Sequence, residues 1–162
     1  LSSTTSRSLV IQISVFTLAH TITLGLAATG VISPPSDIVE PLIALSIALV
    51  AIENLFFTKP PRWRPIVIFL FGLLHGLGFA GFFGELGLPE GQFWSALIGF
   101  NIGVEIGQLS VIILAIAVLS VWRWRNNIEY TDVVYRRFMI LPGSLLIGAT
   151  GSWWAMERVF LN

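Results

Sequence analysis

Long apolar runs separated by short polar breaks make up the whole of this 162-residue chain. A helix needs about 20 mostly apolar residues to cross the hydrocarbon core of a membrane. Five windows meet this requirement, at about residues 9–30, 38–58, 65–84, 93–121 and 138–161. Proline-containing breaks such as SPPSD (33–37) and TKPPRWRP (58–65) cannot continue a helix, and residues 122–137 form the one longer polar loop. The pattern therefore predicts an all-α fold, a polytopic transmembrane helix bundle of five spans that form a single domain over residues 1–162.

Composition supports a membrane protein and narrows its chemistry. Hydrophobic residues make up 55% of the chain and charged residues 11%, against roughly 25% charged in soluble domains. The lipid bilayer is the expected partner, whereas a formal net charge of zero gives no basis for a nucleic-acid partner. The absence of cysteine excludes disulfides and thiolate metal sites. Because the chain begins at Leu1 rather than at methionine, we expect it to be the C-terminal part of a longer precursor.

The basic residues are unevenly distributed, which predicts the orientation of the chain. Eight of the nine Lys and Arg residues fall on one side of the predicted spans: Arg7, Lys59, Arg62, Arg64, Arg123, Arg125, Arg136 and Arg137. Because short cytoplasmic loops are enriched in Lys and Arg, we expect a cytoplasmic N-terminus and an exoplasmic C-terminus. The loops on the opposite side contain the acidic residues Asp37, Glu40, Glu85 and Glu90. They would face outward and attract cations.

Small residues at four-residue spacing mark two of the predicted helices as packing surfaces. One stripe consists of Gly72, Gly76, Ala80 and Gly84, and the other of Gly99, Gly103 and Gly107. Such stripes let helix backbones approach closely inside a membrane, where the surrounding lipid is as apolar as leucine. We expect both stripes to contact helices, either of this chain or of another subunit.

Four ionisable residues lie inside the predicted spans: His20, Glu53, His75 and Glu105. A charged side chain near the bilayer centre costs at least about 2.5 kcal/mol on insertion scales, so each of them marks a functional site by default. The rise of the helix places all four within a slab about 10 Å deep, where they would meet in a small bundle. Polar residues at helical spacing accompany them as candidate supporting partners: Thr17, Asn54, Asn101 and Gln108.

Structural roles stay open for each of these residues taken singly. An intramembrane histidine serves as an interhelical hydrogen-bond partner about as readily as a ligand. Glu53 lies near a loop whose Lys59, Arg62 or Arg64 can form an ion pair with it. Glu105 has no basic residue in its own span, so its charge requires a histidine, a cation or a proton. Two His and two Glu at matching depth favour a metal site with all four residues as ligands.

The segments that hold these residues are FTLAHTITL, ALSIALVAIEN, FGLLHGLGFA and FNIGVEIGQL. In this order they resemble the motifs of the HupE/UreJ family of hydrogenase and urease accessory membrane proteins, from about Phe16 to Gln108 and more loosely to the last span. The resemblance implies a multi-helix protein of the bacterial inner membrane that handles nickel or a related metal, with a permease as one form. The motif positions that it carries over are His20, Glu53, Asn54, His75, Asn101 and Glu105. Hydrogenase-linked members have paired histidines where LLHGLG has one, so the resemblance does not single out nickel.

The leading hypothesis is transport of a divalent transition-metal ion through this intramembrane site. Imidazole and carboxylate together suit nickel, cobalt, zinc or iron, whereas Cu(I) prefers sulfur ligands, which a chain with no Cys and two Met barely offers. An alternative is a non-catalytic subunit or assembly factor of a larger membrane complex, or a homo-oligomer, in which the polar cluster is structural. Haem or pigment binding through His20 and His75 is a third hypothesis. We do not expect an enzyme, because no HExxH or equivalent zinc-hydrolase spacing occurs.

Overall fold

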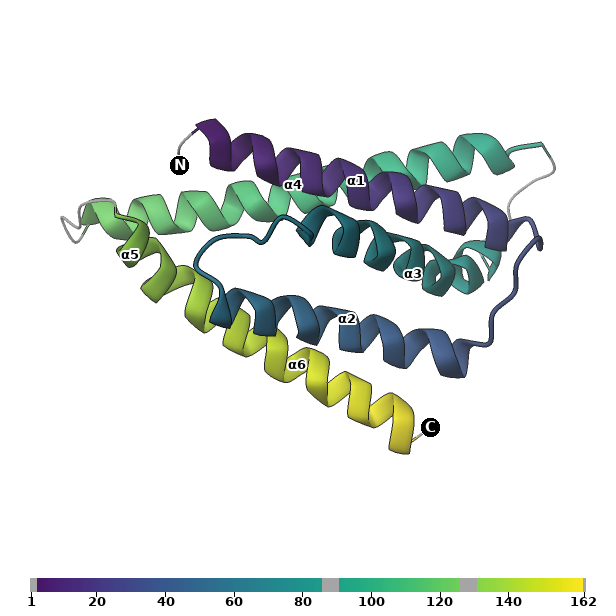
Figure 1. Cartoon of the computed structure of the whole chain (residues 1–162). Helices are drawn as coiled ribbons and strands as arrows, with labels where there is room; N and C mark the ends of the chain where they lie inside the picture. Colours follow the sequence, from purple (N-terminus) through teal and green to yellow (C-terminus); the bar gives the residue numbers. More distant parts are fainter. Residues whose placement is uncertain (1–2, 86–90, 126–130, 162) are drawn as a thin grey trace.

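The computed structural model shows an all-helical protein and describes residues 3–85, 91–125 and 131–161 (Figure 1). Its elements are α1 (Ser3–Ala28), α2 (Ser36–Phe56), α3 (Arg64–Glu85), α4 (Phe93–Arg125), α5 (Asp132–Tyr135), the π-helical turn η1 (Arg136–Ile140) and α6 (Leu141–Phe160). The last three follow one another without a break and form one long helical stretch. Within the described residues, five helices are long and apolar enough to cross a membrane, which confirms the all-helical fold class and the predicted number of spans.

The helices extend further into the polar segments than the apolar pattern predicts. α4 continues through WRWR to Arg125 and helix resumes at Asp132, so the predicted loop over residues 122–137 is wrong in its extent. The apolar run marks only the part of a helix that contacts the membrane core. Each residue added to an existing helix gains one backbone hydrogen bond, so extension is favourable. The segment WRWR contains no proline or glycine that would end the helix. The segments around Pro34 and Pro60 do separate helices.

Two closely packed helix pairs form the bundle: α1 with α3, and α2 with α6. A methyl group on Gly72 would lie 2.6 Å from the carbonyl oxygen of Phe16, and one on Gly76 would lie 2.3 Å from that of His20. A methyl group on Gly151 of α6 would lie 3.0 Å from the backbone of α2. Distances this short leave no room for a side chain, so both pairs touch backbone to backbone. A smaller contact between α2 and α3 joins the pairs, and α4 crosses α1 (Figure 1).

The glycine stripe of α4 has no such contact. Methyl groups on Gly99, Gly103 and Gly107 would meet no atom of the described chain within 4 Å, although we expected this stripe to pack against a helix. α4 contacts α1 through a different face, on which Leu97 and Asn101 are buried. Spacing alone could not show which face of α4 this chain covers.

A small apolar core joins α1, α3 and α4 at Leu24, Phe83 and Leu97. Ala80 of the α3 stripe packs against this core, and Gly84 lies outside the residues whose surroundings the structure describes. Elsewhere, large apolar side chains are exposed on all the spanning helices. A soluble monomer rarely exposes so much apolar surface, whereas in a bilayer these side chains contact lipid.

Candidate functional site

His20 lies in the middle of α1 and is almost completely buried, with 1% of its surface exposed. Neither ring nitrogen has a hydrogen-bond partner among the described residues. The rings of Phe16 and Phe100 stack on the imidazole at centroid distances of 6.1 and 6.2 Å, and Phe79 meets it edge-on at 5.5 Å. An unpaired buried polar group costs about 1–3 kcal/mol. This environment is therefore unlike that of a structural hydrogen-bond partner, and it makes His20 a candidate for binding a water molecule or an ion.

His75 lies on α3, the helix that packs against α1. Its Nδ1 lies 2.8 Å from the backbone oxygen of Phe71. Because a carbonyl oxygen can only accept a hydrogen bond, Nδ1 carries the proton and Nε2 keeps its lone pair. A backbone bond at one ring nitrogen is the usual way in which proteins orient a metal-binding histidine. The ring of Phe16 contacts both histidines: it stacks on His20, and it meets His75 edge-on at a centroid distance of 5.2 Å.

A cavity of about 300 Å³ lies between the two helix pairs, and we call it the Asn54 cavity. Its polar lining comes from Ser46, Asn54, His75 and Ser144. The remaining walls are apolar and include Phe16. His75 thus borders a space large enough for an ion with several water molecules, and no carboxylate lines that space directly.

A second cavity of about 390 Å³ lies between α2, α3 and α6, and we call it the Glu40 cavity. Its lining includes Gly78, Phe79 and Trp154, together with Glu40 and Arg158, which form an ion pair. This cavity borders the first half of α2, whereas the Asn54 cavity borders the second half. Of the other acidic groups expected at this end, Asp37 is exposed in the first turn of α2, whereas Glu90 and the side chain of Glu85 lie outside the described part of the chain.

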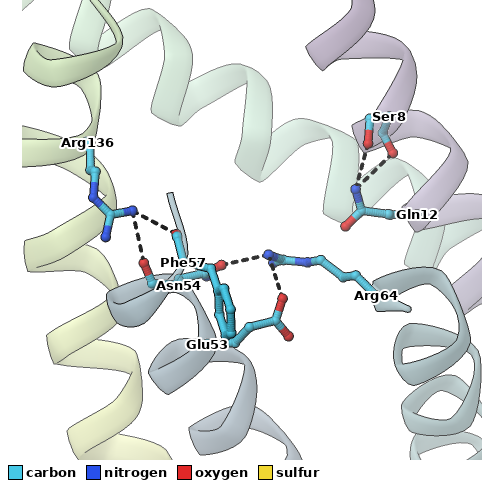
Figure 2. A network of polar contacts seen from close by, with 7 residues as sticks. All are labelled: Ser8, Gln12, Glu53, Asn54, Phe57, Arg64 and Arg136. Atoms are coloured by element: carbon cyan, nitrogen blue, oxygen red, sulfur yellow. Dashed lines mark hydrogen bonds and ion pairs between the residues drawn. The ribbon is translucent and has the colours of Figure 1, made fainter. Parts of the chain in front are cut away.

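Glu53 forms an ion pair with Arg64 rather than joining a histidine (Figure 2). Arg64 Nη1 donates to Glu53 Oε1 at 3.2 Å and to Asn54 Oδ1 at 2.8 Å, with the two charged side chains 17% and 8% exposed. Arg136 donates to the carbonyl oxygens of Asn54, Leu55 and Phe57 at 3.3, 2.8 and 2.8 Å and so caps the C-terminal end of α2. Of the roles left open for Glu53, the structure shows the ion pair, with Arg64 as the partner.

Glu105 and the predicted supporting residues of α4 face α1. Ser14 Oγ donates to Glu105 Oε1 at 3.3 Å, and Thr17 Oγ1 lies 3.5 Å from Gln108 Oε1. Deeper in the same interface, Thr21 Oγ1 donates to Asn101 Oδ1 at 2.7 Å, and Asn101 Nδ2 donates to the backbone oxygen of Leu97 at 2.8 Å. These hydrogen bonds join α1 to α4, beside the apolar core that Leu24 and Leu97 form between the same two helices.

The four predicted ligands therefore occupy three places. His20 and His75 flank Phe16, Glu105 lies at the interface of α1 and α4, and Glu53 binds Arg64. Among the described residues, no three His, Asp or Glu side chains gather closely enough to hold one metal ion. The four side chains do not meet at one point as expected, because each carboxylate has a nearer partner: Ser14 for Glu105 and Arg64 for Glu53.

Some residues around this site were missed in the sequence. Phe16 lies four residues before His20, and that helical spacing was the available signal. Phe79 and Phe100 come from other helices, and nothing in the local sequence connects them with His20. The same is true of Arg136, which reaches α2 from about 80 residues further along the chain.

Comparison with known proteins gives a family. No curated protein and no solved structure matches the chain significantly. One family model, described as HupE / UreJ protein, matches residues 1–158. This family has accessory and transporter-type roles associated with nickel and other metals and is not known as a catalytic family. Because the match extends over nearly the whole chain, the protein belongs to the HupE/UreJ family.

Proposed function

We propose that this protein carries a divalent transition-metal ion, such as nickel, cobalt, zinc or iron, across the membrane by way of His20 and His75. The family's association with metal accessory roles supports a metal ion as the cargo. Neutral imidazole is a good ligand for all four ions. The observation that carries the proposal is the buried ring of His20, whose two nitrogens both lack a hydrogen-bond partner in the described part of the chain.

The scattered arrangement of the ligands favours passage over storage. A closed structural metal site has four protein ligands, and such a site releases its ion slowly. Conduction instead requires binding that is weak enough, or spread over enough places, for the ion to leave again. His75 offers one lone pair in the Asn54 cavity, His20 offers another behind Phe16, and Glu105 supplies a negative charge on the neighbouring helix.

Metal binding and uptake by the purified protein in liposomes test this proposal, with Ni²⁺, Co²⁺ and Zn²⁺ as probes. We expect His20→Leu and His75→Leu each to lower uptake by more than about tenfold, since loss of a mere supporting residue costs roughly 10- to 100-fold. Gln12→Leu is the matched control, because Gln12 is a polar residue of α1 whose side chain, among the described residues, bonds within its own helix to Ser8. Uptake should also fall at acid pH, because protons compete with metal for imidazole. Unchanged binding and uptake in both histidine variants would contradict the proposal.

A second candidate function is that of a subunit or assembly factor in a larger membrane complex or homo-oligomer. The observation that favours it is the exposed stripe of Gly99, Gly103 and Gly107, which contacts no described residue of this chain. A backbone surface of this kind suits close approach by another transmembrane helix. Co-purification of a defined complex that Gly103→Leu disrupts, together with an absence of metal uptake, would favour this candidate over transport.

A further inference from the structure

His20 lines neither of the two cavities. The residues that line the Asn54 cavity include Phe16 but not His20, and those that line the Glu40 cavity include Phe79 but not His20. Both rings contact the imidazole, Phe16 by stacking at 6.1 Å and Phe79 edge-on at 5.5 Å. One phenylalanine therefore stands between His20 and each cavity.

The two cavities extend toward opposite ends of the bundle. The Asn54 cavity reaches the last turn of α2, whereas the Glu40 cavity reaches its first turns. Ile47, in the middle of α2, lines both of them. The cavities thus approach each other at mid-helix, where Phe16 and Phe79 separate them from His20. An ion that moved from one end to the other by way of His20 would have to pass both rings.

The backbones around His20 leave little room for helix movement. A methyl group on Gly72 would lie 2.6 Å from the carbonyl oxygen of Phe16, and one on Gly76 would lie 2.3 Å from that of His20. Interiors packed this closely resist displacement, whereas side chains change rotamer readily. Phe16 borders a cavity of about 300 Å³ and Phe79 one of about 390 Å³, so each ring has a space beside it into which it can turn.

We propose that Phe16 and Phe79 are two gates on either side of His20, so that cargo reaches this histidine from one cavity at a time. The proposal rests on the proposed function, because it takes a divalent cation as the cargo. When the Phe16 ring turns into the Asn54 cavity, an ion held at His75 Nε2 gains access to His20. When the Phe79 ring turns instead, His20 opens to the Glu40 cavity. With both rings in place, as in this structure, His20 is sealed from both ends of the bundle.

The experiment uses the fact that the chain has no cysteine. His20→Cys introduces one thiol at the sealed position, and its rate of modification by a membrane-impermeant cationic methanethiosulfonate is measured in vesicles with the reagent added to one side at a time. In the His20→Cys protein, we expect the added substitution Phe16→Leu to raise the rate of thiol modification about 2- to 10-fold, and only with the reagent on one side. This factor corresponds to the loss of one aromatic contact from the barrier. Phe79→Leu should raise it by a similar factor from the opposite side only. A separate variant, Asn54→Cys, identifies the side to which the Asn54 cavity opens.

Phe71→Leu is the matched control, because Phe71 lines the same cavity as Phe16. In the described part of the chain, the rings that contact His20 are those of Phe16, Phe79 and Phe100, so the control should leave the rate unchanged. Unchanged rates in both gate variants would overturn the proposal. So would an increase from the same side in both, or an effect of Phe71→Leu as large as that of Phe16→Leu.

A second measurement needs no cysteine and no stable gate variant. The chain has two histidines, so mass spectrometry can follow deuterium exchange at the imidazole C2 of each one separately. We expect exchange several-fold slower at His20 than at His75, and equal rates would overturn the sealing of His20. Neither readout involves metal. One-sided opening without metal uptake would therefore refute the proposed function alone, whereas uptake without one-sided opening would refute the gates alone.

Discussion

The surroundings of Glu53 and of His20 are opposite, although both side chains are buried in helices of the same bundle. The Glu53 carboxylate binds Arg64, and Arg136 caps the carbonyl groups that follow it at the end of α2. The two nitrogens of His20 have no hydrogen-bond partner among the described residues, and aromatic rings pack against the imidazole. A membrane helix that keeps a polar group without using it for stability keeps it for what it binds. The comparison therefore indicates that Glu53 and its arginines stabilise the bundle, and it supports the proposal that His20 serves the function.

The largest stability effect is expected where Glu53 loses its partner. Arg64→Leu leaves a carboxylate that is 8% exposed without a counter-ion, and breaking a buried ion pair costs about 3–5 kcal/mol. Equilibrium unfolding in detergent and lipid measures the loss. The double variant Arg64→Leu/Glu53→Leu should recover most of it, because no buried charge is then left unpaired. A loss below about 1 kcal/mol in the single variant would mean that Glu53 is not structural.

The next effect compares the two glycine stripes. Gly76→Ala places a methyl group 2.3 Å from the carbonyl oxygen of His20, so we expect it to lower the free energy of unfolding by about 1–3 kcal/mol. Gly103→Ala meets no described atom within 4 Å and should change the free energy by less than about 0.5 kcal/mol. Thermal unfolding of the two variants side by side measures the difference. A cost for Gly103→Ala as large as that for Gly76→Ala would show that another chain covers α4.

A smaller effect is expected at the interface of α1 and α4, where the polar groups are paired. Thr21→Val removes the 2.7 Å hydrogen bond to Asn101, and interhelical hydrogen bonds in membranes average about 0.6 kcal/mol with a maximum near 1.7. Thr150→Val is the control, since the hydroxyl of Thr150 donates within its own helix, to the backbone oxygen of Leu146. The same unfolding measurement applies. Equal costs for the two variants would mean that the bond to Asn101 contributes nothing to the packing of α1 on α4.

The sequence predicted the features of this molecule that depend on nearby residues. Hydropathy and proline positions are local, so the five spans could be predicted, and four-residue spacing identified Gly72 and Gly76 as packing positions. The partner of each face is not local. Nothing along the chain distinguishes the covered stripe of α3 from the uncovered stripe of α4, because both have the same spacing.

For the candidate site, too, the sequence predicted the residues but not their partners. His20 and His75 could be named because an ionisable residue in an apolar span is costly. Their surroundings could not, because the rings around His20 come from three helices that meet only in the folded chain. The choice of Arg64 over its basic neighbours as the partner of Glu53 depends in the same way on how the loop between α2 and α3 positions α3. Matching depth in the membrane showed which residues can approach one another, and rotation of each helix about its axis decided which of them do.

The smallest stability effect is expected at His20. Its sign distinguishes a buried polar residue without a hydrogen-bond partner from one that is hydrogen-bonded. His20→Leu removes two unpaired buried nitrogens and replaces them with an apolar side chain of similar size, so the protein should keep its stability or gain about 1 kcal/mol. Asn101→Leu is the matched comparison, since Asn101 is also buried in a span but is bonded to Thr21 and Leu97, and its loss should cost up to about 1.7 kcal/mol. Metal uptake should respond the other way, falling most in His20→Leu. If His20→Leu instead destabilises the protein as much as Asn101→Leu does, then His20 has a structural partner and the site must be sought elsewhere in the bundle.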